Sequence, residues 1–183
     1  ERFKRMDFNY TLSGREAISR SLSYYNLEKK DCVTILTTTG NHYISSCVTN
    51  EIEKICSWSR LIEENTKIIL VNHEFGYPYN DLLKLREYEL PIIEDCAHSF
   101  FSQDKDCTIG TVGDFVIYSL PKMFPMQIGG LLVSNVPNRL EKQNQISPES
   151  LRYIKNVLSY SIKFEKEIIQ TRLFNYNFLK AFQ

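Results

Sequence analysis

Short apolar runs rich in β-branched residues alternate with amphipathic stretches along the first two thirds of the chain. The run CVTILT (32–37) suits a buried strand better than a helix. The stretch GREAISRSLSYYN (14–26) instead carries its apolar residues at helical spacing. Such alternation is typical of parallel strands joined by helices. It predicts an α/β fold, a three-layer α/β/α sandwich around a mostly parallel mixed sheet.

The same periodicities predict where the individual strands and helices lie. Strands are expected at 32–37, 67–71, 91–94, 114–120 and 129–134, and helices at 14–26 and 43–54. From about residue 148, apolar residues at helical spacing continue to the end and predict a long helix broken once or twice. We therefore expect one domain over 1–147 and a helical segment over 148–183. Because the chain begins at Glu1 and stops inside this pattern, the sequence suggests a piece of a longer protein.

The charge balance excludes some classes of partner. Lysine plus arginine total 22 and aspartate plus glutamate total 22, so no broad field attracts nucleic acid or a membrane surface. No apolar run reaches the roughly 18–20 residues that span a bilayer, and the N-terminus is charged rather than signal-like. We expect a soluble, cytoplasmic protein that binds neither nucleic acid nor membrane.

The cysteines do not form a metal-binding pattern. Five are irregularly spaced without a CxxC pair, and we predict reduced, mostly buried thiols: Cys32, Cys47, Cys56, Cys96 and Cys107. Cys107 could join His98 in a zinc site, but the usual spacing of paired ligands is absent. We therefore expect no metal.

The segment PIIEDCAHS places polar groups after an apolar strand. In α/β sheets, ligands bind beyond the carboxyl ends of strands. Asp95 could there hold the pyridine nitrogen of a pyridoxal ring, and His98 could reach the ring hydroxyl. A plainer interpretation is that Asp95 caps the next turn and His98 is an ordinary boundary histidine.

The segment DFVIYSLPKMFPMQIGG places Lys122 in a proline-rich turn between two expected strands, with Ser119 at the end of the first. A lysine beside an apolar wall can lose its proton by desolvation and act as a nucleophile. The pair Gly129–Gly130 would let backbone approach a bound cofactor. Alternatively, Lys122 is a solvated loop charge and the two glycines form a simple turn.

The segment LSGREA leads into the first expected helix. Free N–H groups and the helix dipole at such a turn can receive a phosphate group. Ser13 is equally a plain N-cap.

Taken together, these motifs resemble the DegT/DnrJ/StrS family of sugar aminotransferases. The resemblance covers roughly residues 10–135 and rests on motifs in a consistent order: SG-x-x-A, H-x-x-G-x-P (His73, Gly76, Pro78), EDCAHS, G-x-x-GD (Gly110, Gly113, Asp114) and S-x-x-K followed by GG. It implies the large domain of a fold-type-I enzyme that depends on pyridoxal 5'-phosphate. Residues 1–147 would bind the cofactor, and 148–183 would lead toward a small domain outside this sequence.

The resemblance also implies roles for single residues. Lys122 would hold the cofactor as a Schiff base, Asp95 would pair with the pyridine nitrogen, and His98 would lie near the ring hydroxyl. The phosphate would be held by Ser119 and by the turn Gly14, Arg15 and Glu16, and Tyr43 or His42 would cover the ring. The sequence departs from the family in a short serine-to-lysine spacer, in Arg15 where many members have threonine, and in a short stretch between Lys54 and Lys67 that puts the outer sheet in doubt.

The activity implied is transfer of an amino group from a donor such as glutamate to a nucleotide-linked keto-sugar, in the synthesis of surface polysaccharide precursors. The resemblance also implies a homodimer, and Phe100, Phe101, Phe124 and Met126 could face a partner or pack in the core. Three alternatives are open. A sugar dehydratase of the same family is disfavoured, because such enzymes have histidine in place of the lysine and Lys122 is present. A nucleotide-binding Rossmann module is disfavoured because G-x-G-x-x-G is absent after the first expected strand. A non-catalytic relic or regulatory protein of the same fold is the main alternative.

Overall fold

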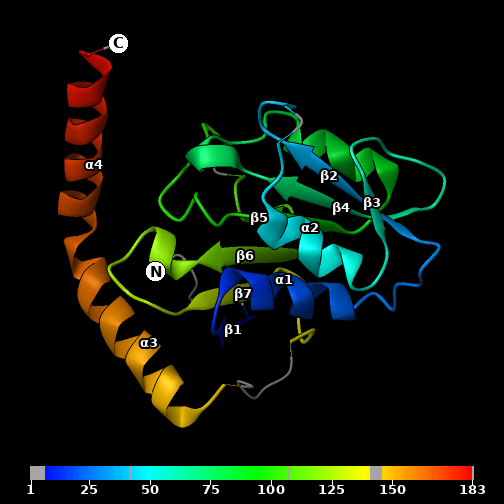
Figure 1. Ribbon diagram of the computed structural model, residues 1–183, viewed down its shortest axis with the longest axis horizontal. Helices are drawn as coiled ribbons and strands as arrows, with labels where there is room; N and C mark the ends of the chain where they lie inside the picture. Colours follow the sequence, from blue (N-terminus) through cyan, green and yellow to red (C-terminus); the bar gives the residue numbers. More distant parts are fainter. Residues whose placement is uncertain (1–6, 42, 107, 141–145, 183) are drawn as a thin grey trace.

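The computed structural model describes residues 7–41, 43–106, 108–140 and 146–182. Seven strands form one sheet in the order β1-β7-β6-β5-β4-β2-β3 (Figure 1). The strands are β1 (Asp7–Thr11), β2 (Cys32–Thr37), β3 (Ser57–Ser59), β4 (Thr66–Asn72), β5 (Ile92–Asp95), β6 (Phe115–Ser119) and β7 (Gly130–Ser134). The neighbours from β3 to β6 pair in parallel, whereas β7 pairs antiparallel with both β6 and β1. The mostly parallel mixed sheet predicted from the sequence is confirmed.

Helical elements cover both faces of the sheet. The α-helices are α1 (Gly14–Ser23), α2 (Ser46–Glu53), α3 (Pro148–Ser161) and α4 (Glu165–Lys180), and the 3-10 helices are η1 (Glu74–Gly76), η2 (Leu82–Tyr88), η3 (Leu120–Lys122) and η4 (Ile162–Phe164). On one face, α1 and α2 pack on alternate strand residues such as Val33, Ile35 and Ile117. On the other, Ile154 of α3 and Leu85 of η2 pack on the intervening residues. The three-layer arrangement follows from this period-2 alternation.

Several expected boundaries were wrong. The first helix ends at Ser23 rather than at residue 26, because Asn26 has a positive φ of 48°. The second begins at Ser46, where Ser45 caps it, rather than at residue 43. Between β4 and β5 the structure also has the 3-10 helix η2, for which no helix had been expected.

Two edge strands were not predicted. The strand β1 pairs with β7, and the three-residue β3 pairs with β2, so the sheet continues at the position where the short 54–67 stretch had put it in doubt. The C-terminal helix was expected to break once or twice, and η4 interrupts it between α3 and α4. Figure 1 shows α4 extending beyond the sandwich, and none of its residues is buried.

The aromatic residues proposed as partner contacts pack internally instead. Phe100, Phe124 and Met126 are buried, and Phe101 packs partly buried against the same cluster. Phe100 contacts Tyr118 and Phe124 edge to face. Core packing, the plainer interpretation, is therefore correct for this group, because the segments after β5 and after β6 pack together in one cluster.

Candidate functional site

The carboxyl ends of the parallel strands line a cavity of about 510 Å³. Thr37, Asn72 and Asp95 end three neighbouring strands and lie opposite one another in register. Ser119 ends the next strand, β6. Because alternate strand residues share a face, these four side chains lie on the face that α1 and α2 cover. The cavity lies where α/β sheets bind ligands.

Asp95 is the buried acid of this cavity. Its side chain is 4% exposed, and its two carboxylate oxygens accept hydrogen bonds from Asn72 Nδ2 at 2.9 Å and from the Ala97 N–H at 3.0 Å. Burial raises the pKa of Asp95, and the Ala97 N–H and the charges of Lys122 and His98 oppose that rise only in part. Asp95 is therefore a fixed, enclosed acceptor that a positively charged ligand nitrogen would stabilise in its ionised form.

Lys122 and His98 both line the cavity and are in direct contact with each other. Lys122 Nζ lies 3.0 Å from His98 Nε2, and the His98 ring stacks on Phe75 with centroids 5.7 Å apart. Burial, and next the charge of Lys122, lower the pKa of His98, so the neutral imidazole is favoured. Lys122 ends η3 and is exposed, so the apolar enclosure expected from the sequence is not provided by the described residues.

The N-terminus of α1 closes one end of the cavity. Ser13 caps the helix by accepting from the Glu16 N–H, and Gly14 and Arg15 line the cavity. A Cβ on Gly14 would lie 3.1 Å from Ser119 Cβ, so glycine allows the helix to approach β6 closely. Because the first N–H groups of a helix have no partner within it, this end can receive an anion.

Of the expected cofactor-binding residues Glu16 and Tyr43, Tyr43 lines the cavity and Glu16 does not. Glu16 is outside the set of cavity-lining residues, since its carboxylate pairs with Arg20 and accepts from the Leu12 N–H. It fixes the entrance to α1. Tyr43 lines the cavity and is 71% exposed. His42, the other expected ring-covering residue, lies outside the described residues.

Sequence reasoning missed some of the cavity wall. Asn72 was not singled out, although it ends the strand beside Asp95 and could have been found by aligning strand ends. Phe75 and Glu74 also line the cavity. Phe75 has a positive φ of 51°, which no simple pattern predicts. This conformation accompanies its position over His98.

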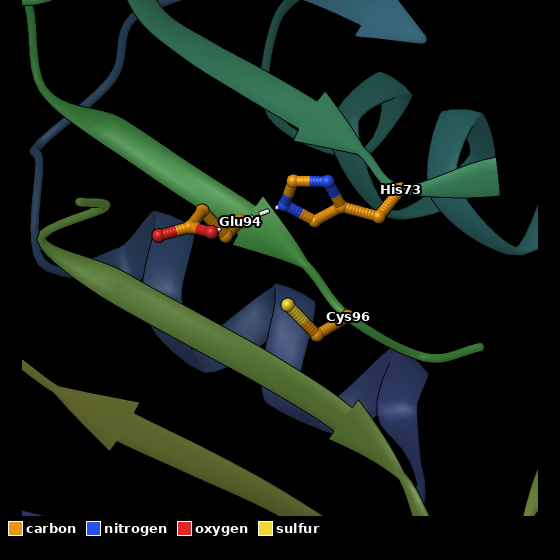
Figure 2. Close-up of side chains that lie close together, drawn as sticks. All are labelled: His73, Glu94 and Cys96. Carbon is orange, nitrogen blue, oxygen red and sulfur yellow. Dashed lines mark hydrogen bonds and ion pairs between the residues drawn. The ribbon is translucent and has the colours of Figure 1, made fainter. Parts of the chain in front are cut away.

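A buried pair beneath the cavity holds these strand ends together (Figure 2). His73 Nε2 lies 3.0 Å from Glu94 Oε2, and both side chains are fully buried. His73 Nδ1 accepts from the Tyr79 N–H at 3.1 Å, so Nε2 carries the proton and donates to Glu94. The His73 N–H in turn donates to the Asp95 carbonyl. The pair therefore fixes the backbone that presents Asp95.

Cys96 lies beside this pair, and the three side chains have the ligand types of a metal site (Figure 2). The lone pairs of Glu94 are already engaged, however. Oε1 accepts from the N–H groups of Val112 and Gly113, and Oε2 accepts from that of Gly110 as well as from His73. A cation would have to displace these bonds, so the geometry favours a structural hydrogen-bond cluster.

The described cysteines form no disulfide: Cys32, Cys56 and Cys96 are buried and Cys47 is exposed. Cys107, the other half of the zinc site considered above, lies outside the described residues. Within the described ranges, no helix is long and apolar enough to cross a membrane.

Comparisons with known proteins identify the family and the fold. A sequence model of the DegT/DnrJ/EryC1/StrS aminotransferase family matches residues 52–167. An uncharacterized protein of Methanocaldococcus jannaschii, MJ1066, is 35% identical over 86 residues, and the match covers 44% of this chain and 22% of that protein.

Among solved structures, the aminotransferase TlmJ from Streptoalloteichus hindustanus superposes with a TM-score of 0.61 at 20% identity, covering 72% of this chain and 41% of its own. The putative sugar aminotransferase Spr1654 from Streptococcus pneumoniae, in its PMP form, gives 0.59 at 16% identity, covering 73% and 42%. These similarities show the fold. The chain spans less than half the length of each of these proteins.

Proposed function

Because the chain belongs to the DegT/DnrJ/EryC1/StrS aminotransferase family, we propose that it is the cofactor-binding part of a sugar aminotransferase. Pyridoxal 5'-phosphate is the cofactor of this family. The observation that carries the proposal is the gathering of Asp95, His98, Ser119 and Lys122 around one cavity, with the start of α1 at its end.

The donor and acceptor set fits that cofactor. The phosphate would lie at the N-terminus of α1, near the N–H groups of Gly14 and Arg15 and the Ser119 hydroxyl, because Gly14 lets the start of the helix approach Ser119 closely. Tyr43 lies at the wall where it could cover the ring. Glu16 would contribute only indirectly, by holding the start of α1 in place.

Asp95 and His98 would orient the ring from two sides. Asp95 would keep a proton on the ring nitrogen, since its carboxylate is held by Asn72 and Ala97 and shielded from water. His98, neutral and stacked on Phe75, would contact the ring oxygen. When bound, the cofactor supplies an electron sink for negative charge at the substrate carbon.

Lys122 would hold the cofactor covalently through its amine. When its amine is free, Lys122 would also carry a proton to or from the substrate carbon. The neutral imidazole of His98, 3.0 Å from Lys122 Nζ, can accept a hydrogen bond from the protonated amine. The described residues leave Lys122 exposed, so a further part of the active enzyme would have to shield it from water.

We also propose the substrates, the domain division, the assembly and the cellular location of this protein. The amino donor is an amino acid such as glutamate, and the acceptor is a nucleotide-linked keto-sugar used for surface polysaccharide. Residues 1–147 form the cofactor domain, and 148–183 lead toward a small domain. The active form is a homodimer in the cytoplasm. The exposed rings of Tyr43 and Phe75 at the cavity, 71% and 72% exposed, support a covering partner.

The test is cofactor binding by the full-length protein. Addition of pyridoxal phosphate should give an absorbance band near the edge of the visible range, and Lys122→Ala should abolish this band. Lys30→Ala, the control, should retain it, because Lys30 is an exposed lysine paired with Glu28. A band that survives Lys122→Ala contradicts the assignment of the lysine. Failure of the folded wild-type protein to bind the cofactor would support the non-catalytic alternative instead.

A further inference from the structure

A second cavity, of about 500 Å³, lies next to the first. Its walls are the end of β2 with the loop that follows it (residues 36–40), the pair Arg60 and Leu61 after β3, and residues 79–81. Thr37 lines both cavities. This second cavity therefore also lies at the carboxyl end of the sheet, where α/β proteins bind ligands.

The guanidinium of Arg60 is incompletely paired. Nη2 donates to Thr37 Oγ1 at 2.8 Å, whereas Nη1 is enclosed and has no hydrogen-bond partner in the part of the chain that the structure describes. Among the described residues, Arg60 forms no ion pair with a carboxylate. An enclosed donor without an acceptor is unfavourable, and a partly buried cation without a counter-ion attracts an anion.

Neither of the other charged groups near this cavity, Asp81 and Glu74, forms an ion pair with Arg60 among the described residues. Asp81 lines the wall, but its carboxylate pairs with Lys84 Nζ at 2.7 Å. Glu74, on the far side of the 37–40 loop, accepts hydrogen bonds from the Thr39 N–H and hydroxyl. Arg60 is therefore the charged residue of this wall that has no ion-pair partner among the described residues.

We propose that this second cavity is an oxyanion-binding site in which Arg60 pairs with a phosphate or carboxylate group. The planar guanidinium offers parallel donors that match both groups. A small rotation of the side chain would bring the enclosed Nη1 to the cavity, where the anion supplies the acceptor that the protein lacks. If the proposed function holds, on which this last step rests, the anion is a charged group of the sugar nucleotide or of the amino donor, next to the cofactor cavity.

The experiment is an anion titration of the full-length protein without cofactor, followed by NMR at constant ionic strength. Pyrophosphate and glutarate serve as the two probes, one for each source of the oxyanion. The observed signals are the Arg60 Nε–H and the backbone amides of residues 37–40. The variants are Arg60→Gln, Arg60→Lys and Arg152→Gln, the last removing an equal charge from the exposed face of α3.

Saturable shifts at Arg60 and at 37–40 are expected for one probe more strongly than for the other, which identifies the source. Arg60→Gln should weaken binding about tenfold or more, as for loss of a charge-assisted hydrogen bond, while Arg60→Lys retains part of it and Arg152→Gln all of it. Shifts in the wild-type protein that avoid Arg60, or equal losses in Arg60→Gln and Arg152→Gln, overturn the proposal. Because no cofactor is present, failure of the Lys122 assignment would leave this result unchanged.

Discussion

Replacement of Glu94 by glutamine should destabilise the protein strongly while changing its shape very little. The Glu94 carboxylate accepts four hydrogen bonds, from the N–H groups of Gly110, Val112 and Gly113 and from His73 Nε2. In Glu94→Gln an amide NH₂ replaces one oxygen, so two buried donors face another donor. Each unsatisfied buried group costs about 1–3 kcal/mol, which gives about 2–6 kcal/mol in total.

A change of tautomer in His73 would not remove this cost. If Nε2 became an acceptor for the new amide, Nδ1 would carry the proton and face the Tyr79 N–H, which it now accepts at 3.1 Å. The unpaired donor would move rather than disappear. The expected loss is therefore a large part of the roughly 5–15 kcal/mol that stabilises a typical domain.

Urea unfolding followed by circular dichroism measures this loss as a lower midpoint at an unchanged slope. Glu87→Gln is the matched control, because Glu87 is exposed on η2 and its replacement should stay within about 0.5 kcal/mol of wild type. A Glu94→Gln midpoint equal to that of the control would refute the reasoning. So would stabilisation of the wild type by zinc that a chelator reverses, since that would indicate a metal site at His73, Glu94 and Cys96.

Three further predictions concern the surroundings of the site. Gly130→Ala should lower the free energy of unfolding by about 1–3 kcal/mol, because the new Cβ would lie 2.5 Å from Thr11 Oγ1; unchanged urea unfolding would contradict this. Although burial opposes it, hydrogen bonds from Thr39 lower the pKa of Glu74. Its stabilisation is thus present above the unfolded value of 4.5 and lost as pH falls through the lower folded value, so the stability difference between wild type and Glu74→Gln should shrink toward pH 3. Arg172 donates to the backbone carbonyl of Lys122 at 3.0 Å; Arg172→Ala should weaken cofactor binding up to about tenfold, and equal affinities measured by absorbance titration would refute the contact's role.

The sequence predicted the layer arrangement because period-2 and helical periodicities are local properties of the chain. The strand at 32–37 was predicted with its observed bounds, since a short β-branched run between polar segments is unambiguous. Edge strands are harder to predict from the sequence. The strand β3 has only three residues, and β1 is partly exposed, so neither carries a buried run and each depends on its neighbour in the sheet.

The site residues at strand ends could be predicted because parallel strands bring their carboxyl ends to one edge. Asp95 and Ser119 follow this rule, and their place in one cavity needed only the strand assignments. The Phe75–His98 stack and the enclosure of Arg60 depend on loop conformations that no local pattern specifies. The exposure of Lys122 was missed for a related reason, since the apolar residues that follow it pack inward rather than around the amine.

The most direct test of the central claim is to identify which lysine holds the cofactor. The full-length protein loaded with pyridoxal phosphate would be reduced with borohydride, digested and examined by peptide mass spectrometry. We predict a pyridoxyl group on Lys122 alone, lost in Lys122→Ala. A pyridoxyl group on another lysine, or none on a protein that binds the cofactor, would contradict the account.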